Sequence, residues 1–181
     1  LKKKPEKKMS INNYLKEILN GDLDKVKSYD TNLINEIGKV NPKGYDLIPL
    51  FAAIALYSEN NEKGRKMIEY LLSIPNVNVS KKVVSGGQWT NEITTLYHLI
   101  SSVSMDEETC RMILNHPSFN IDIINTIDHD DYRPLDLADE YNPKIVNLLE
   151  SKGAKRHWRV GPGFKNGTCS QSSQSQIEVP N

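Results

Sequence analysis

Four histidines and two cysteines are the side chains that could act here as general bases, nucleophiles or zinc ligands: His98, His116, His129, His157, Cys110 and Cys169. Nucleophilic catalysis needs a base within hydrogen-bond reach of its nucleophile, and no pair of these residues has a recognisable spacing. Cys169 has no second Cys or His at the spacing of a zinc site. The GxGxxG, P-loop, HExxH and GxSxG motifs are absent as well. The sequence therefore predicts no catalytic residues, no metal site and no cofactor.

The connection between residues 80 and 94 carries residues suited to binding another protein. Gln88, Trp89, Thr90 and Asn91 follow two glycines in this segment. Tryptophan is enriched among the residues that dominate binding energy at interfaces. Trp89 and its neighbours are therefore candidate partner contacts, although local packing of the Trp89 ring is the commoner role of such a residue.

A second polar segment is the acidic run at residues 128–132. Clustered carboxylates could meet a basic partner or a divalent cation, but the run lacks the Gly and the distal Glu of an EF-hand loop. Aspartate favours turns because its side chain bonds its own backbone, so a solvated turn is the simpler interpretation. His129, Asp130, Asp131 and Tyr132 are kept as candidate contacts for a protein partner.

Both segments lie between copies of one repeated phrase. The copies are IPLFAA at 48–53, TTLYHL at 94–99 and RPLDLA at 133–138. Each opens a helical pattern and is followed by a second apolar stretch, in which Ile68, Cys110 and Val146 hold equivalent places. Val26 holds the same place in an earlier unit, which lacks a clear copy of the phrase. The four residues are spaced 42, 42 and 36 residues apart. A lone helical pair cannot bury its apolar stripe, whereas stacked pairs can. We therefore expect Ile68, Cys110 and Val146 to be buried at equivalent positions.

Local residues predict where the helices begin and end. Pro49 and Pro134 suit a first helical position, where the missing N–H would have no partner. Asn142-Pro143 is typical of an N-cap followed by a first helical residue. Ser104 and Glu107 have the spacing of a capping box, and the glycine of Asn20-Gly21 suits a helix stop.

The repeated phrase resembles the ankyrin repeat, whose signature is T-P-L-H-x-A. The last unit is the most similar, since its phrase is followed by a second helix and by Lys152-Gly153-Ala154, a usual ankyrin ending. The phrase at 94–99 lacks Pro, and His98 matches the motif's His only if Thr95 is the motif's Thr. The resemblance covers about residues 10–154. It implies an all-α, ankyrin-type solenoid of about four helical pairs with short hairpin fingers, the first pair degenerate as in terminal capping repeats.

Two features leave the family and the architecture of the ends open. The long spacings indicate insertions in the loops and also allow another helical-pair solenoid, such as HEAT-like repeats. Residues 1–9 form a basic tail, and residues 155–181 are first basic and then rich in Ser and Gln. Such compositions bury too little surface to fold alone, so the predicted domain spans 10–154.

Composition narrows the class of protein. The 181 residues have a formal net charge of zero and no apolar run near the ~20 residues that span a bilayer. Two cysteines indicate a reducing compartment rather than a disulfide scaffold, so we expect a cytoplasmic protein. A nucleic-acid partner is disfavoured because no basic, aromatic-interleaved stripe runs through the repeats.

The expected function is non-catalytic binding of a protein partner. In the ankyrin family the binding surface is made by the fingers and the inner, first helices, so this step is an analogy from fold. The alternative is a targeting segment of a larger, possibly host-directed bacterial effector that acts in the host cytosol and carries its enzymatic domain outside this chain. The full reading frame would distinguish the two.

Overall fold

The computed structural model describes residues 10–40, 46–86 and 91–157. Within these residues the chain is mostly helical, with one small antiparallel sheet, so the expected helical class is confirmed. The α-helices are α1 (Ile11–Asn20), α2 (Leu23–Lys27), α3 (Pro49–Glu59), α4 (Asn61–Leu72), α5 (Leu96–Ser102), α6 (Glu107–Leu114), α7 (Pro134–Tyr141) and α8 (Val146–Ser151). The strands are β1 (Lys82–Gly86) and β2 (Asn91–Thr95), and the 3₁₀ helices are η1 (Thr31–Asn35), η2 (Ile123–Asn125) and η3 (Pro143–Ile145).

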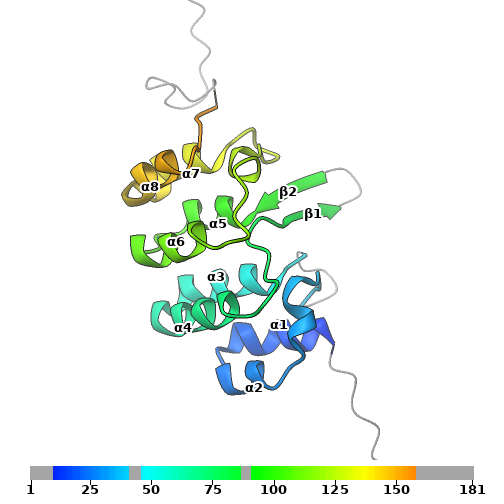
Figure 1. The fold of residues 1–181 in the computed structure, drawn as a ribbon. Helices are drawn as coiled ribbons and strands as arrows, with labels where there is room; N and C mark the ends of the chain where they lie inside the picture. Colours follow the sequence, from blue (N-terminus) through cyan, green and yellow to red (C-terminus); the bar gives the residue numbers. More distant parts are fainter. Residues whose placement is uncertain (1–9, 41–45, 87–90, 158–181) are drawn as a thin grey trace, which may run out of the picture.

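Successive helical pairs lie one above another in chain order (Figure 1). The first helices contact each other in sequence, α1 with α3, α3 with α5 and α5 with α7. The second helices do the same from α4 to α6 and from α6 to η3. Buried apolar side chains come from every pair, so one core runs through the stack. None of the described helices is both long enough and apolar enough to cross a bilayer.

Helix α4 approaches α3 closely because it carries a glycine at the contact. A Cβ at Gly64 would lie 2.2 Å from the Cα of Tyr57 and 2.4 Å from its backbone nitrogen. No side chain fits within those distances, so the close packing of these two helices depends on Gly64. The hydroxyl of Tyr57 in turn donates to the carboxylate of Asp106, 2.7 Å away, at the start of α6.

Several predicted helix boundaries are confirmed, and one is wrong. Pro49 and Pro134 stand at the first position of α3 and α7, and Gly21 ends α1 with φ of 71°. Helix α6, however, is capped by Asp106, whose carboxylate accepts the Thr109 N–H at 2.9 Å, and not by Ser104. Met105 lies between Ser104 and α6 and is buried. The residue that caps α6 is therefore Asp106, which follows Met105.

Asn142 stands at the N-cap of η3 and Pro143 at the start of this helix, as expected, but the Asn142 side chain makes no capping hydrogen bond. Its side-chain amide is buried and donates to the carbonyls of Ile100 and Met105, both at 3.2 Å. The amide therefore satisfies carbonyls at the end of α5 and in the next connection, so it links the third helical pair to the fourth.

The expected burial of the second helices is confirmed at Ile68 and Cys110, which are fully buried, and wrong at Val146, which is only partly buried. Ile145 is fully buried in its place. The reason is the short 3₁₀ helix η3 ahead of α8. A 3₁₀ turn has 3.0 residues instead of 3.6, so the apolar side is displaced by one residue.

One hydrogen-bonding arrangement recurs between successive pairs. The side chains of Asn35, Ser80 and Asn125 each reach a carbonyl and the N–H two residues after it in the pair that follows. The partner residues are 76 and 78 for Asn35, 118 and 120 for Ser80, and 153 and 155 for Asn125. The same contact is thus made three times along the chain.

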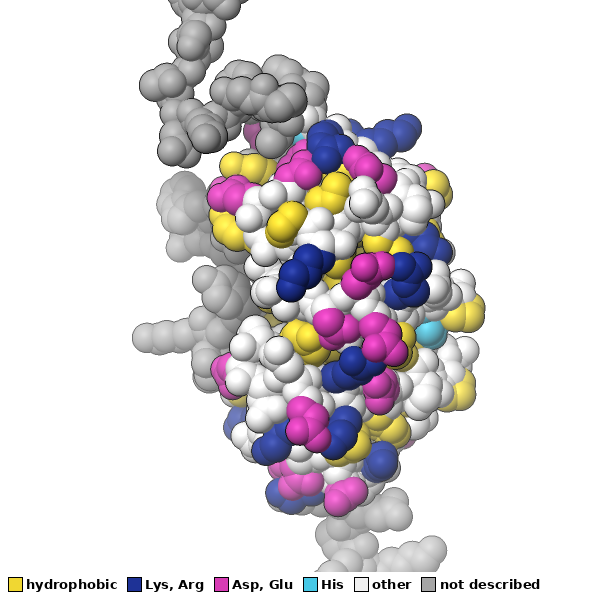
Figure 2. Space-filling model, turned by 90° about the vertical axis from the view of Figure 1, so that its left-hand side faces the viewer, with side chains coloured by type: hydrophobic (Ala, Val, Ile, Leu, Met, Phe, Trp, Pro, Cys, Tyr) yellow, Lys and Arg dark blue, Asp and Glu magenta, His cyan; other side chains and the backbone are white. Residues whose placement is uncertain are grey.

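Charged side chains of both signs intersperse on the face to which α4, α6 and α8 contribute (Figure 2). Arg65 of α4 pairs with Glu69 of its own helix and with Glu108 of α6, at 3.2 and 2.6 Å. Arg156 pairs with Asp139 of α7 and Glu150 of α8. Exposed pairs of this kind contribute little stability individually, so this face is a solvated one.

Candidate binding surface

Three connections between the helical pairs turn back on themselves, and we call them fingers. Finger 1 comprises residues 38–47, closed by two hydrogen bonds of 2.9 Å between Gly38 and Leu47. Finger 2 is the hairpin of β1 and β2, residues 82–95. Finger 3 comprises residues 126–132. The β1–β2 hairpin projects from the stack on the side away from α4, α6 and α8 (Figure 1).

Finger 2 is an antiparallel hairpin with one buried side at its base. Val83 lies opposite Thr94 and is buried, whereas Val84 lies opposite Ile93 and is 51% exposed. This alternation follows from the two-residue period of a strand. The candidates Gln88, Trp89 and Thr90 lie outside the described residues, and Asn91 begins β2 opposite Gly86. A role for Trp89 at an interface stays a prediction.

Finger 3 is a turn built by its first aspartate. The carboxylate of Asp128 accepts the N–H groups of Asp130 and Tyr132 at 3.0 and 2.9 Å, and the Asp128 N–H donates to the Tyr132 carbonyl. Asp131 takes a positive φ of 65°. The Asp128 side chain is thus occupied by its own turn, as the simpler interpretation of the sequence requires.

The other candidates of finger 3 differ in exposure. His129 and Asp130 are exposed and lie 3.1 Å apart, Nε2 to carboxylate. Asp131 is exposed and Tyr132 partly exposed. Among the described residues, His, Cys, Asp and Glu side chains form no group of three or more that could hold a metal ion. His129, Asp130 and Asp131 thus give this finger an exposed polar surface.

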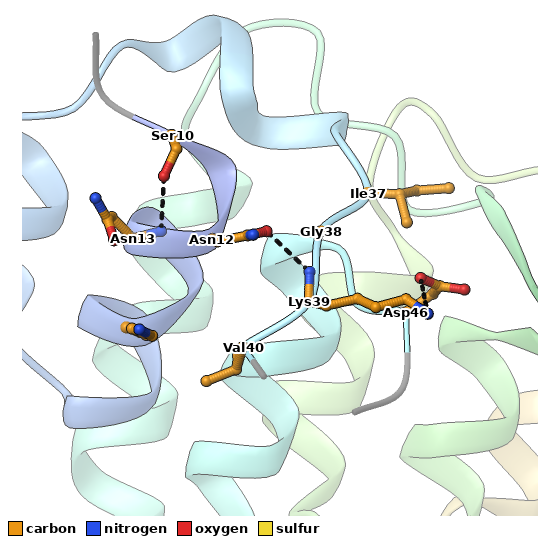
Figure 3. A pocket seen from close by; sticks show the side chains of 9 residues that line it. Ser10, Asn12, Asn13, Ile37, Gly38, Lys39, Val40 and Asp46 are labelled. Atoms are coloured by element: carbon orange, nitrogen blue, oxygen red, sulfur yellow. Dashed lines mark hydrogen bonds and ion pairs between the residues drawn. The ribbon is translucent and has the colours of Figure 1, made fainter. Parts of the chain in front are cut away.

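An open pocket of about 730 Å³ lies between the start of α1 and finger 1 (Figure 3). Its lining is mainly polar and includes Ser10, Asn12, Asn13, Lys16, Lys39 and Asp46. The Asn12 side chain accepts the Lys39 N–H at 2.9 Å, and Lys39 pairs with Asp46 at 3.5 Å. Two lysines and a carboxylate suit contacts with polar groups of a partner, and this lining contains no paired nucleophile and base.

Sequence reasoning did not single out this pocket. The 42-residue spacing between Val26 and Ile68 predicts a long connection, and finger 1 belongs to the connection between α2 and α3. What the spacing could not predict is the contact of finger 1 with α1. A Cβ at Gly38 would lie 2.7 Å from the Asn12 side-chain oxygen and 2.8 Å from the Ile11 side chain, so the approach requires this glycine.

Cys110, His116 and His98 occupy structural positions. Burial, reinforced by Asp106 and Glu107, raises the pKa of the Cys110 thiol to about 12, which disfavours the thiolate needed of a nucleophile. The Nδ1 atom of His116 contacts the Ser118 hydroxyl at 2.8 Å and accepts the Ser118 N–H. His98 is buried in the first turn of α5, where it contacts Thr95.

The first helices add small and polar side chains to the exposed surface. Ala55 and Ser58 of α3 and Ser102 of α5 are exposed, and Tyr141 at the end of α7 is 52% exposed.

Compared with known proteins, the chain matches no family model, no curated protein and no solved structure. Its function must therefore be argued from its own residues.

Proposed function

We propose that this chain is an ankyrin-type module that binds a protein partner through its fingers and first helices and carries out no catalysis. Its place of action would be the cytoplasm, or a host cytosol if the chain belongs to a secreted effector. The observation that carries the proposal is the recurring contact of Asn35, Ser80 and Asn125 with the pair that follows each of them. Repeats that touch only their neighbours are typical of solenoids, which present extended binding surfaces.

The starts of the first helices support the ankyrin type over other helical repeats. Ile48, Thr95 and Arg133 are the N-caps of α3, α5 and α7, so the three phrases align with Thr95 as the motif's Thr. His98 then falls on the motif's His. The projecting hairpin of finger 2 also fits the ankyrin type, in which hairpins join successive pairs.

The chemistry of the surface supports binding rather than turnover. The fingers combine exposed apolar side chains, Ile37 beside finger 1 and Val84 on finger 2, with polar groups at the end of finger 3. A preorganised surface loses little conformational entropy on association. The described histidines and Cys110 serve packing, capping or surface ion pairing, which leaves them without a catalytic arrangement.

The test compares finger variants with a variant of the opposite face. The immobilised full chain captures proteins from a lysate, and calorimetry with each purified captured protein measures the affinity of Trp89→Ala, Asp130→Ala and the control Lys66→Ala. Lys66 pairs with Glu62 on exposed α4. We expect Trp89→Ala to weaken binding by about 2 kcal/mol, roughly thirtyfold in Kd, Asp130→Ala to weaken it less, and Lys66→Ala to leave it unchanged.

The melting temperature of each variant separates binding from folding. If the Trp89 ring packs locally, Trp89→Ala will lower stability by about 3–5 kcal/mol and its folded fraction will bind normally, which removes Trp89 from the surface. Equal loss of binding in the finger variants and in Lys66→Ala contradicts the proposal. So does turnover by the purified protein that a change at His98, Cys110 or His129 abolishes.

A further inference from the structure

Fingers 1 and 2 close with equivalent pairs of residues, so their side chains can be compared position by position. In finger 1 Gly38 is bonded to Leu47, and in finger 2 Val83 lies opposite Thr94. Leu47 and Thr94 each stand one residue before the N-cap of a first helix, α3 and α5 respectively. Gly38 of finger 1 therefore corresponds to Val83 of finger 2.

The side chains next to Gly38 point away from α1. A Cβ at Gly38 would lie 2.7 Å from the side-chain oxygen of Asn12 in α1, so this residue faces α1. Side chains alternate between the two sides of an extended chain, which places Ile37 and Lys39 on the outer side of finger 1 and Glu36 on the other. Figure 3 shows the Ile37 side chain directed away from α1. Ile37 is 45% exposed, and Lys39 is exposed as well.

Finger 2 has the same alternation around Val83. Val83 is buried, whereas Lys82 and Val84 on either side of it are exposed. The start of this finger lies beside the start of finger 1, because the Lys81 ammonium donates to the carbonyl of Asn35. The outer sides of the two fingers therefore adjoin each other.

Each of these outer sides combines one apolar residue with one lysine. Ile37 of finger 1 takes the place that Lys82 takes in finger 2, and Lys39 takes that of Val84. Lys39 pairs with Asp46 of its own finger at 3.5 Å, and its side chain stays 44% exposed. An ammonium has three N–H donors, so Lys39 can bond a second carboxylate. The surface thus suits a ligand that carries acidic and apolar groups side by side.

Finger 3 differs from the other two in charge. The Asp128 N–H donates to the Tyr132 carbonyl, one residue before the N-cap of α7, so His129 stands at the place of Lys39. Asp130 lies 3.1 Å from Nε2 of His129 and, like the aspartate after it, is exposed. These carboxylates repel an acidic ligand at close range. The surface that suits such a ligand is therefore limited to fingers 1 and 2.

The spacing of these two fingers matches one turn of an extended chain. Finger 1 leads into α3 and finger 2 into α5, and the two helices contact each other. Helices in contact lie about 8–10 Å apart, and a polyproline II segment advances by about 9 Å in each turn of about three residues. One turn per finger therefore brings the same set of side chains to both fingers.

We propose that the outer sides of fingers 1 and 2 bind an extended acidic segment of the protein partner, in which each turn of about three residues carries one acidic and one apolar side chain. The carboxylates pair with Lys39 and Lys82, and the apolar groups cover Ile37 and Val84. This inference rests on the proposed function, since it names the chemistry of the partner that the fingers bind.

Three synthetic peptides and the full chain test the proposal. The probe is (Glu-Leu-Pro)₄, in which proline favours the extended form, and its controls are (Lys-Leu-Pro)₄ and (Glu-Ser-Pro)₄. Fluorescence anisotropy measures each Kd, and NMR identifies the amides that shift. We expect the probe to bind about tenfold more tightly than either control, and to shift amides of fingers 1 and 2 while those of α4 stay unchanged.

Variants of the outer surface provide the matched comparison. Lys82→Ala and Val84→Ser should each weaken binding of (Glu-Leu-Pro)₄ by about threefold, and Lys66→Ala of α4 should leave it unchanged. Lys39→Glu combined with Lys82→Glu should reverse the preference, so that (Lys-Leu-Pro)₄ binds more tightly. All four residues are exposed, and the melting temperature of each variant checks that it is folded.

Equal binding of (Lys-Leu-Pro)₄ and (Glu-Leu-Pro)₄ by the unaltered protein overturns this inference, as does an unchanged Kd in Lys82→Ala and Val84→Ser. So does a set of shifted amides centred outside fingers 1 and 2. Failure of the proposed function has a different sign, because Trp89→Ala and Asp130→Ala would then both keep full affinity for the captured partner. Those variants test whether the fingers bind the partner at all, whereas the lysine variants test which chemistry two of the fingers accept.

Discussion

Asp106 shows how one side chain can satisfy several groups from different helices. Its carboxylate caps α6 through Thr109, accepts the Tyr57 hydroxyl from α3, and lies 3.8 Å from the guanidinium of Arg65 in α4. Burial alone would raise the pKa of Asp106, but the hydrogen bonds from Thr109 and Tyr57 and the charge of Arg65 outweigh it and lower the pKa to about 2. The ionised form is therefore the one that the fold stabilises.

This lowered pKa predicts a loss of stability in acid. The pKa in the folded protein lies below the ordinary value of 3.8, so the contribution is complete above about pH 4 and is lost as the pH falls toward about 2. Asn is also a good N-cap, so Asp106→Asn removes mainly the charge. We expect denaturant midpoints of the two proteins to differ at pH 7 and to converge between pH 4 and 2.

Glu107→Gln is the control for Asp106, because Glu107 is the next residue and pairs with Arg111 at an exposed position. Its midpoint should stay close to that of the unaltered protein throughout. A gap between Asp106→Asn and the unaltered protein that is as wide at pH 2 as at pH 7 would show that the charge of Asp106 is not what matters.

The contact of α3 with α4 leads to a prediction about Gly64. In an exposed helix, replacing Gly by Ala stabilises by up to about 1 kcal/mol. At Gly64 the new Cβ would lie 2.2 Å from the Tyr57 Cα, so the two backbones must move apart. We expect Gly64→Ala to destabilise the protein by about 1–3 kcal/mol, the cost of overpacking, as measured by denaturant unfolding.

Lys63→Ala tests the same helix without the steric effect, since Lys63 is exposed and Ala favours the helix slightly more than Lys. Its stability should change by less than about 0.5 kcal/mol. If Gly64→Ala proved as stable as Lys63→Ala, the close approach of α3 and α4 would be dispensable.

The helices themselves could be predicted from the sequence, because their caps and apolar spacing are local. Pro49, Pro134 and Gly21 stand where local chemistry places them. The bonds of the Asn142 side chain could not be predicted in this way, since its amide donates to carbonyls about forty residues earlier in the chain. The shift from Val146 to Ile145 depends likewise on a 3₁₀ turn that the periodicity does not reveal.

The candidate site was predictable only in part. The turn made by Asp128 follows from the residue type and is confirmed. The pocket beside finger 1 depends on which helix finger 1 contacts, and the contact of the His98 ring with the Tyr132 carbonyl depends on which connection lies beside α5. Both are contacts between units, which a repeat pattern implies without naming the residues that make them. Ankyrin type and partner binding stay predictions.

The stacked arrangement predicts that damage at one junction stays local. Asn125 bonds Gly153 and Lys155 at 3.0 and 2.7 Å, and Asn125→Ala removes both bonds at a cost of about 1–3 kcal/mol. Because each pair contacts its neighbours, we expect hydrogen exchange to show lost protection in α7 and α8 and native protection in α1 to α4.

Asn147→Ala, an exposed asparagine of α8, is the control for the same residue type and should leave exchange unchanged. Protection lost evenly over all helices in Asn125→Ala would mean that the protein unfolds as a single cooperative unit.

The contacts of Asn125 also bear on how such a protein can change in evolution. Gly153, with φ of 85°, and Lys155 follow α8, and the Lys155 N–H donates to the Asn125 side chain. In the same way, the N–H groups of residues 78 and 120 donate to the side chains of Asn35 and Ser80 after the earlier pairs. The backbone N–H of His157 is then held by Asp136. The chain that follows α8 is therefore held by the same hydrogen-bonding arrangement as the chain that follows α4 and α6. A segment inserted there by duplication would find the hydrogen bonds of Asn125 to Gly153 and Lys155 already in place, so this contact would not have to evolve anew.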